Sequence, residues 1–171
     1  MQSFIYARLF ITVTLLLAAM FPQITCASGI DIRGINFRVD RPSQGQNMED
    51  AVAEPRADSF AVLRNTADVL IKYPKIKVKV IGFTDDRECR GKDCIRLSLR
   101  RARYVLNWLT GYGVPRTQLY GPEGRGSAEP INDNAIDTGR SQNRRVEIRD
   151  ASLSECMFVG NCTYKSGGQV E

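Results

Sequence analysis

The segment KIKVKVIGFTDDRECRGKDCIRLSLRRARYVLN, residues 75–107, predicts a strand, a short loop and a helix in succession. At its start lysine alternates with isoleucine and valine, which is the period-2 pattern of a strand with one buried face. Ile81 and Phe83 then place apolar side chains on the lysine side. We therefore expect the second half of this strand to be covered on both faces.

The helix of this segment carries apolar residues at spacings of three and four, which predicts one buried face. These residues are Ile95, Leu99, Ala102, Leu106 and Leu109. At about 100° per residue, Arg101 and Arg103 fall on the two flanks of this face, and Arg100 points away from it. Asp85, at the end of the strand, therefore faces an arginine early in the helix across a short loop. Periodicity alone does not separate Arg101 from Arg103.

The rest of the chain predicts three further strands and one further helix. A first strand within residues 30–41 changes phase at Gly34, which indicates a bulge or a strand start there. An irregular loop over residues 42–53, a helix over 55–73, a strand over 117–121, a long loop over 124–139 and a strand over 144–149 are expected elsewhere. In the last strand, alternation places Val146 and Ile148 inward and the charged residues outward. The order β-α-β-α-β-β predicts a two-layer α+β fold, with two helices on one face of a mixed four-stranded sheet.

Residues 1–27 have the pattern of a secretory signal peptide, with an apolar run over residues 9–21 and small residues before a cleavage position. We expect one domain over residues 28–150 and a C-terminal tail over residues 151–171. Lipid attachment at Cys26 is the alternative, although the residues before it lack the usual leucine and small residue. The apolar run is too short for a comfortable membrane span.

Four cysteines remain after that segment, namely Cys89, Cys94, Cys156 and Cys162. An even number in an exported chain indicates disulfides, and two short-range pairs, Cys89–Cys94 and Cys156–Cys162, are the simplest of three connectivities. A four-cysteine zinc site is the alternative, but both spacings exceed the usual two-residue gap and the compartment is oxidising. We expect no metal and no cofactor.

Charge and composition exclude several function classes. The net charge of +5 arises from 24 basic and 19 acidic residues that are interspersed along the chain. A basic face with stacking aromatic residues is not visible, so no nucleic-acid partner is expected. The absence of histidine removes the commonest general base. No Ser/His, Cys/His or paired-carboxylate arrangement presents itself, and we expect a protein that is not an enzyme.

Four motifs stand in register over residues 76–148. They are Gly82-Phe83-Thr84-Asp85, Leu97-Ser98-Leu99-Arg100-Arg101-Ala102, Gly124-Arg125-Gly126 with Pro130, and Asn134, Gly139-Arg140 and Asn143-Arg144-Arg145-Val146-Glu147. In order and approximate spacing this series resembles the OmpA-like C-terminal domain family, the module found in OmpA, Pal and MotB. The first predicted strand and helix extend the likeness towards the N-terminus.

The resemblance implies non-covalent binding of peptidoglycan through the diaminopimelate of its stem peptide, in the periplasm and in association with the outer membrane. Diaminopimelate offers an ammonium beside a carboxylate, so an acid can accept from the former while an arginine forks onto the latter. Asp85 and Arg101 match the family's paired acid and arginine. The alternative is a structural or protein-interaction domain of an envelope complex, with weak or no peptidoglycan binding and other envelope proteins as partners.

The resemblance adds Thr84, Leu97 and Arg145 to the candidate peptidoglycan-binding residues. Helix N-terminal amides near Leu97 could donate to the ligand's anion. Arg145 is a third contact unless Arg144 faces the pocket instead. Asp85 and Thr84 also have a structural interpretation, because both side chains can hydrogen-bond the backbone of the turn.

The chain departs from the family pattern in three places. Phe83 stands where histidine or tyrosine is usual, Cys94 stands where asparagine is common, and Ile136 stands where threonine is usual. The loop between the acid and the arginine is also slightly longer. A disulfide from Cys89 to Cys94 would stiffen that loop and preorganise the pocket.

Overall fold

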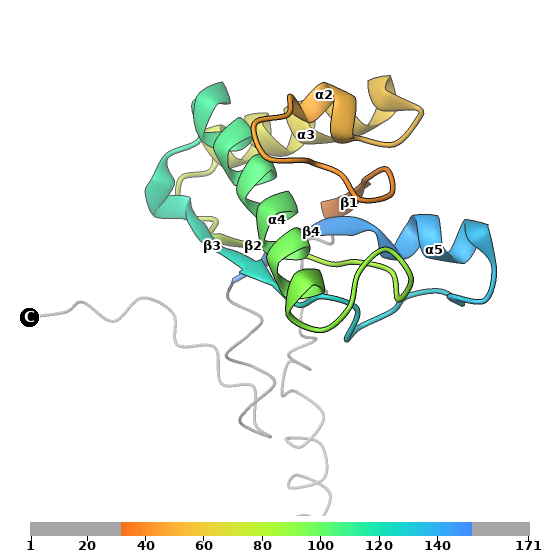
Figure 1. Ribbon diagram of the computed structural model, residues 1–171. Coiled ribbons are helices and arrows are strands. Elements are labelled where there is room, and N and C mark those ends of the chain that lie inside the picture. The colour runs from red at the N-terminus through yellow and green to blue at the C-terminus, as the bar shows by residue number, and fades with distance from the viewer. Residues whose placement is uncertain (1–31, 152–171) are drawn as a thin grey trace, which may run out of the picture.

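The computed structural model describes residues 32–151 (Figure 1). Its strands are β1 (Ile32–Asn36), β2 (Val78–Gly82), β3 (Leu119–Gly124) and β4 (Arg145–Asp150). Its helices are α2 (Met48–Ala51), α3 (Arg56–Lys72), α4 (Lys92–Tyr112) and α5 (Asp137–Asn143), with a 3-10 turn, η2 (Arg116–Gln118), before β3. The predicted signal segment, the lipid-attachment alternative at Cys26 and the Cys156–Cys162 pair lie outside the described residues.

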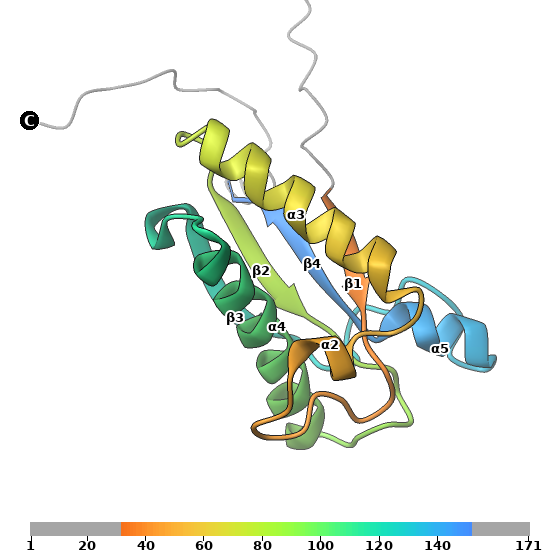
Figure 2. The ribbon, with the colours of Figure 1, turned by 90° about the horizontal axis from the view of Figure 1, so that it is seen from above.

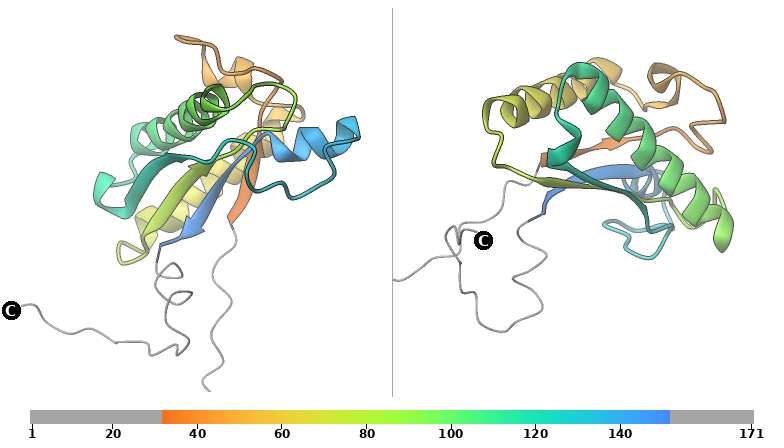
Figure 3. Two further views of the ribbon diagram at one scale, coloured as in Figure 1. Left: turned by 60° about the horizontal axis from the view of Figure 1, so that its bottom comes forward. Right: turned by 90° about the vertical axis from the view of Figure 1, so that its left-hand side faces the viewer.

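The four strands form one mixed sheet in the order β1-β4-β2-β3. Strand β4 is antiparallel to both of its neighbours, whereas β2 and β3 are parallel. Figure 2 and the right-hand view of Figure 3 show α3 and α4 over the same face of this sheet. The two-layer α+β fold predicted from the sequence is therefore confirmed. Within residues 32–151, no helix combines the length and the apolar character that crossing a bilayer requires.

The hydrophobic core fills the space between the helices and the sheet. From α3 it takes Leu63, Ala67 and Leu70, which are spaced four and three residues apart and so share one face of the helix. The sheet contributes Ile35, Val78, Val80, Val146 and Ile148. Strand β1 begins at Ile32 and shifts register between Ile32 and Ile35, so of the two alternatives expected at Gly34, a bulge or a strand start, the structure favours the bulge. Helix α3 ends at Lys72, two residues before Pro74, because proline cannot continue a helix.

Two short helices were not predicted. Residues 42–53, expected to be an irregular loop, contain α2, and Val52 after it is fully buried in a bridge to Phe37. The long loop expected over residues 124–139 is interrupted by α5, which runs on to Asn143. Both helices lack an apolar stripe of their own, because one or two turns are too short to display the 3.6-residue period.

The predicted buried face of α4 is also corrected. Ile95 was placed on this face, but its side chain is 45% exposed. The residues that α4 buries are Cys94, Leu97, Ser98, Arg101, Ala102, Val105, Leu106 and Leu109. The true face is thus rotated so that Arg101 lies within it, whereas Arg100 and Arg103 lie outside it. Periodicity missed this because it assigns a charged side chain to the surface.

Helix α4 crosses the sheet at backbone contact. A Cβ atom on Gly82 would lie 2.0 Å from the carbonyl oxygen of Ser98, and one on Gly124 would lie 2.5 Å from the amide nitrogen of Leu99. Only glycine at both positions permits this approach. The close crossing brings the first turns of α4 beside the ends of β2 and β3, where the candidate site is located.

Phe83, just beyond β2, is buried on both sides as expected. On the face away from the helices its ring is covered by arginine side chains, with the guanidinium carbon of Arg145 at 4.0 Å and that of Arg149 at 5.6 Å from the ring centroid. The far face of the sheet is therefore closed at this point by cation–π contacts and needs no second layer of helices.

Candidate functional site

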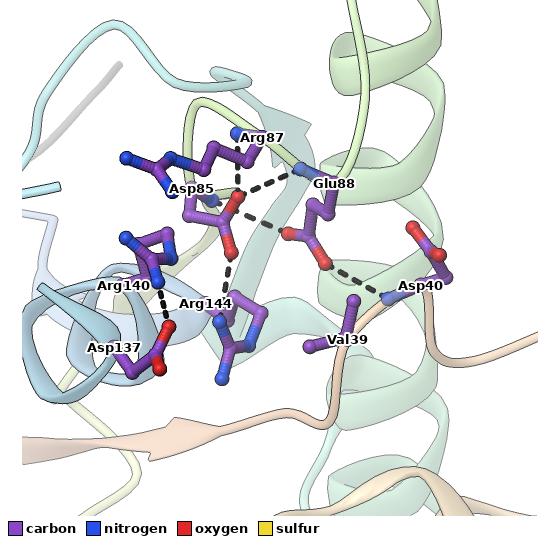
Figure 4. A pocket seen from close by; sticks show the side chains of 8 residues that line it. All are labelled: Val39, Asp40, Asp85, Arg87, Glu88, Asp137, Arg140 and Arg144. Atoms are coloured by element: carbon purple, nitrogen blue, oxygen red, sulfur yellow. Dashed lines mark hydrogen bonds and ion pairs between the residues drawn. The ribbon is translucent and has the colours of Figure 1, made fainter. Parts of the chain in front are cut away.

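The site lies at one end of the sheet, where the loop after β1, the loop after β2 and the junction of α5 with β4 meet (Figure 4). It is a hollow of about 340 Å³. Its lining consists of Val39, Asp40, Asp85, Arg87, Glu88, Asp137, Arg140 and Arg144. Acidic and basic side chains therefore share one cavity, so a ligand that carries both charges is chemically matched to it.

Asp85 serves both the turn and the cavity. Its Oδ1 atom accepts the backbone N–H groups of Arg87 at 2.7 Å and of Glu88 at 2.8 Å, which holds the loop in a tight turn. Its Oδ2 atom accepts Nη1 of Arg144 at 2.8 Å. A carboxylate offers about four acceptor positions, so one remains beside Arg144 for a further donor.

The environment keeps Asp85 ionised. Burial raises the pKa of this carboxyl, but the hydrogen bond from Arg144, the backbone amides of Glu88 and Arg87 and the charge of Arg144 together outweigh that effect. The pKa of Asp85 therefore lies below its usual value, and the group is a carboxylate at neutral pH.

The motif Asn143-Arg144-Arg145 divides its side chains among three tasks. Asn143 is fully buried and holds the preceding loop, accepting the amides of Ile131 and Asn132. Arg144 turns into the cavity with its side chain 12% exposed. Arg145 turns away from it, onto Phe83. Of the two arginines weighed from the sequence, the structure therefore places Arg144, and not Arg145, in the hollow with Asp85.

Arg101 is completely buried and does not line this hollow. Its Nη1 and Nη2 atoms bind the carboxylate of Glu88 side by side at 2.6 and 2.7 Å. The other three donors reach backbone carbonyl groups, those of Phe83 at 2.9 Å, Arg38 at 3.1 Å and Arg41 at 2.7 Å. All five N–H groups of the guanidinium are thus engaged within the protein.

Thr84 and Leu97 also lie beneath the surface. Thr84 is buried, and its hydroxyl oxygen has no hydrogen-bond partner in the described part of the chain. Leu97 follows the first five residues of α4, so its amide lies beyond the four that lack helical partners at an N-terminus. The amide donors expected near Leu97 are therefore earlier in the helix. Peptidoglycan-binding roles for Thr84, Leu97, Arg101 and Arg145 stay predictions.

The predicted Cys89–Cys94 disulfide is present, with the two Cα atoms 5.1 Å apart. It ties the loop after Asp85 to the first turn of α4. Both thiols are consumed by this bond, so neither is available to the alternative zinc site.

Sequence reasoning missed five charged residues of the lining, namely Asp40, Arg87, Glu88, Asp137 and Arg140. Arg140 donates to the backbone carbonyl of Asn134 at 2.6 Å and pairs with Asp137. It belongs to a quoted motif, which was the available signal. Glu88 is a loop residue without periodicity, and only its position between Asp85 and the arginine-rich helix could have indicated it.

The fold is a small two-layer α+β domain with a charged hollow at one end of its sheet, and a comparison with known proteins identifies its family. The family model described as OmpA family matches residues 56–144, more than half of the chain. The chain therefore belongs to the OmpA family.

Individual relatives add detail. The probable lipoprotein YiaD of Escherichia coli K12 is 44% identical over 87 residues, which are 50% of this chain and 38% of that protein. The peptidoglycan-binding protein ArfA of Mycobacterium bovis is 38% identical over 89 residues, 52% of this chain and 27% of ArfA. The crystal structure of the C-terminal domain of Helicobacter pylori MotB matches with a TM-score of 0.54 at 31% identity, covering 72% of this chain and 91% of that domain. The chain spans less than half the length of these two curated relatives.

Proposed function

We propose that this domain binds peptidoglycan non-covalently and without catalysis, and so anchors the envelope to the cell wall. The observation that carries the proposal is the ionised Asp85 beside Arg144 in one hollow. A relative of the same family is a peptidoglycan-binding protein by name. This supports a wall ligand over other zwitterionic molecules. We also propose an exported location at the periplasmic side of the outer membrane, in line with relatives that are named as outer-membrane proteins.

The ligand group we propose is the side-chain end of diaminopimelate, which carries an ammonium and a carboxylate on one carbon. The free acceptor position of Asp85 would take the ammonium. In the state that the structure describes, with Glu88 bound to Arg101, Arg144 offers the carboxylate its Nη2 group, which has no hydrogen-bond partner among residues 32–151. Both contacts are charge-assisted, and partial burial strengthens them relative to water.

Sedimentation with purified diaminopimelate-type sacculi tests this function. The Asp85→Asn variant keeps an oxygen for the turn but loses the charge that attracts the ammonium. We expect its affinity to fall at least about tenfold, equivalent to about 1.4 kcal/mol. Asp86→Asn is the matched control, because it removes the same charge from the next residue, whose side chain is exposed. Equal pelleting of wild type and both variants would contradict the assignment of the site.

A protein-interaction domain within an envelope complex is the second candidate. One observation favours it, namely that every donor of Arg101 is already bound inside the protein. If this second function is the correct one, the fold is retained, and we expect the wild-type protein to stay in the supernatant when sacculi are pelleted.

A further inference from the structure

The guanidinium of Arg101 forms part of a binding position for a carboxylate, which we call the carboxylate subsite. It consists of Nη1 and Nη2 of Arg101 and the backbone N–H groups of Asp40 and Asp85. All four donors converge on Glu88, at 2.6 and 2.7 Å from Arg101, 2.9 Å from Asp40 and 3.3 Å from Asp85. Such a set of donors is specific for a carboxylate in shape and charge, whichever molecule supplies that carboxylate.

The present occupant, Glu88, belongs to a short loop and borders two hollows. The cavity of about 340 Å³ described above has Glu88 in its wall, and so does a second hollow of about 320 Å³. The second is lined by Asp40, Glu88, Cys89, Asp93, Arg96, Leu97 and Arg100. Glu88 therefore lies between the two hollows, as does Asp40, which also lines both. Departure of the Glu88 side chain would open the carboxylate subsite to a molecule in either of them.

Two restraints hold Glu88 in this position. Its backbone N–H donates to Oδ1 of Asp85, and its neighbour Cys89 is fixed to α4 by the disulfide. Both restraints act on the backbone of the loop and not on the Glu88 side chain. The side chain could therefore rotate out of the subsite while the loop stays folded. The first restraint is a hydrogen bond to Asp85, which we also propose as the acceptor for the ligand's ammonium. Ligand binding and release of Glu88 therefore both involve the carboxylate of Asp85.

We infer that Glu88 is an internal competitor, which occupies the carboxylate subsite until a carboxylate of the ligand displaces it. This inference rests on the proposed function for the identity of that ligand. The apparent affinity of a site that is blocked most of the time is reduced by the fraction of molecules in which it is open. Glu88 thus sets the affinity of the domain, and Arg101 becomes a ligand contact only in the displaced state.

The first experiment needs no peptidoglycan. The Glu88→Ala variant leaves Arg101 buried without its partner, and acetate at about 100 mM should enter the subsite and raise the melting temperature by about 3 °C or more over the same concentration of chloride. Wild type should show no such difference. Glu123→Ala is the matched control and should also show no difference between acetate and chloride. It loses a carboxylate that forms partly exposed ion pairs with Lys79 and Arg125. Absence of an acetate effect in Glu88→Ala would overturn the subsite.

The second experiment measures displacement. With the competitor removed, Glu88→Ala should bind sacculi about tenfold more tightly than wild type. Equal or weaker binding would overturn the inference and make Glu88 a structural partner of Arg101. If acetate stabilises the variant but neither protein binds sacculi, the proposed function fails while the subsite stands. Should Glu88→Ala not fold, Glu88→Gln takes its place in both experiments, because glutamine keeps the volume but replaces one acceptor oxygen by an amino group that opposes the arginine donors.

Discussion

Arg101 carries a full positive charge in the interior of the domain, and this burial is tolerated because every donor has an acceptor. Three of the acceptors are backbone carbonyl groups and the others are the oxygens of Glu88, whose side chain is also fully buried. A buried pair of this kind adds little net stability by itself, but removal of one partner leaves an uncompensated charge or empty donors. Arg101 is therefore a structural residue as well as a candidate ligand contact.

We predict that Arg101→Ala lowers the free energy of unfolding by about 3–5 kcal/mol, because it leaves Glu88 buried without a counter-charge and removes one donor from each of three carbonyl groups. Urea unfolding measures this. Arg103→Ala is the control, since its side chain is exposed on the same helix, and its effect should stay within about 0.5 kcal/mol. If Arg101→Ala is as stable as wild type, the buried network does not hold the loop as described. Weak binding by Arg101→Ala is informative only at temperatures where the variant remains folded.

At the scale of elements, the position of α4 on β2 and β3 determines the geometry of the site. The helix is close enough for Nη1 of Arg101 to reach the carbonyl of Phe83 because Gly82 and Gly124 carry no side chains. The same crossing buries Ser98, whose hydroxyl accepts the amide of Gly126 at 2.9 Å. Strand ends, helix and loop are thus positioned by contact between backbones.

Gly82→Ala should separate α4 from the sheet, because its Cβ atom would stand 2.0 Å from a backbone oxygen that belongs to a rigid helix. We expect a loss of about 3 kcal/mol, at the upper end of what overpacked cores lose, together with reduced binding to sacculi. Thermal unfolding measures the stability. The control is Gly111→Ala, at a helical position with open space, which should be neutral or stabilising by up to about 1 kcal/mol. Similar melting temperatures for the two variants would contradict the backbone contact.

At the scale of the whole molecule, the site joins segments that are distant in sequence. The Asp85–Arg144 pair links residues 59 positions apart, and Nε of Arg144 donates to the carbonyl of Phe37, 107 positions away. The loop after β1, the end of β2 and the start of β4 are therefore held together by charge. The integrity of this end of the domain should depend on the ionisation of Asp85.

The pKa of Asp85 is lower in the folded protein than in the unfolded chain, so the carboxylate stabilises the fold above its ordinary pKa and this contribution is lost as pH falls through the folded value. We predict that Asp85→Asn is less stable than wild type at neutral pH. The difference should shrink as pH falls below about 4 and vanish once Asp85 is protonated. Urea unfolding at a series of pH values measures it. A difference that stays constant to the lowest pH would show that the charge of Asp85 is not responsible.

Much of the fold follows from local pattern. Alternation of lysine with apolar residues defines β2, and a stripe with Leu63, Ala67 and Leu70 defines α3. Close spacing of Cys89 and Cys94 indicated their bond. These features were predictable because each depends on residues within a few positions of one another, where the period of the chain fixes which side is buried. The order of the motifs was sufficient to indicate the family.

The membership of the site was decided by the tertiary structure. Arg144 and Arg145 are neighbours of the same residue type, yet Arg144 faces the hollow and Arg145 covers Phe83. Burial of Arg101 requires acceptors from two segments that are distant from it in sequence or lie in loops, residues 38–41 and 83–88, and Glu88 becomes its partner only when the loop is folded against α4. A charged side chain is buried where distant parts of the chain supply its counter-charge, and such a supply is a property of three-dimensional packing that no local period contains.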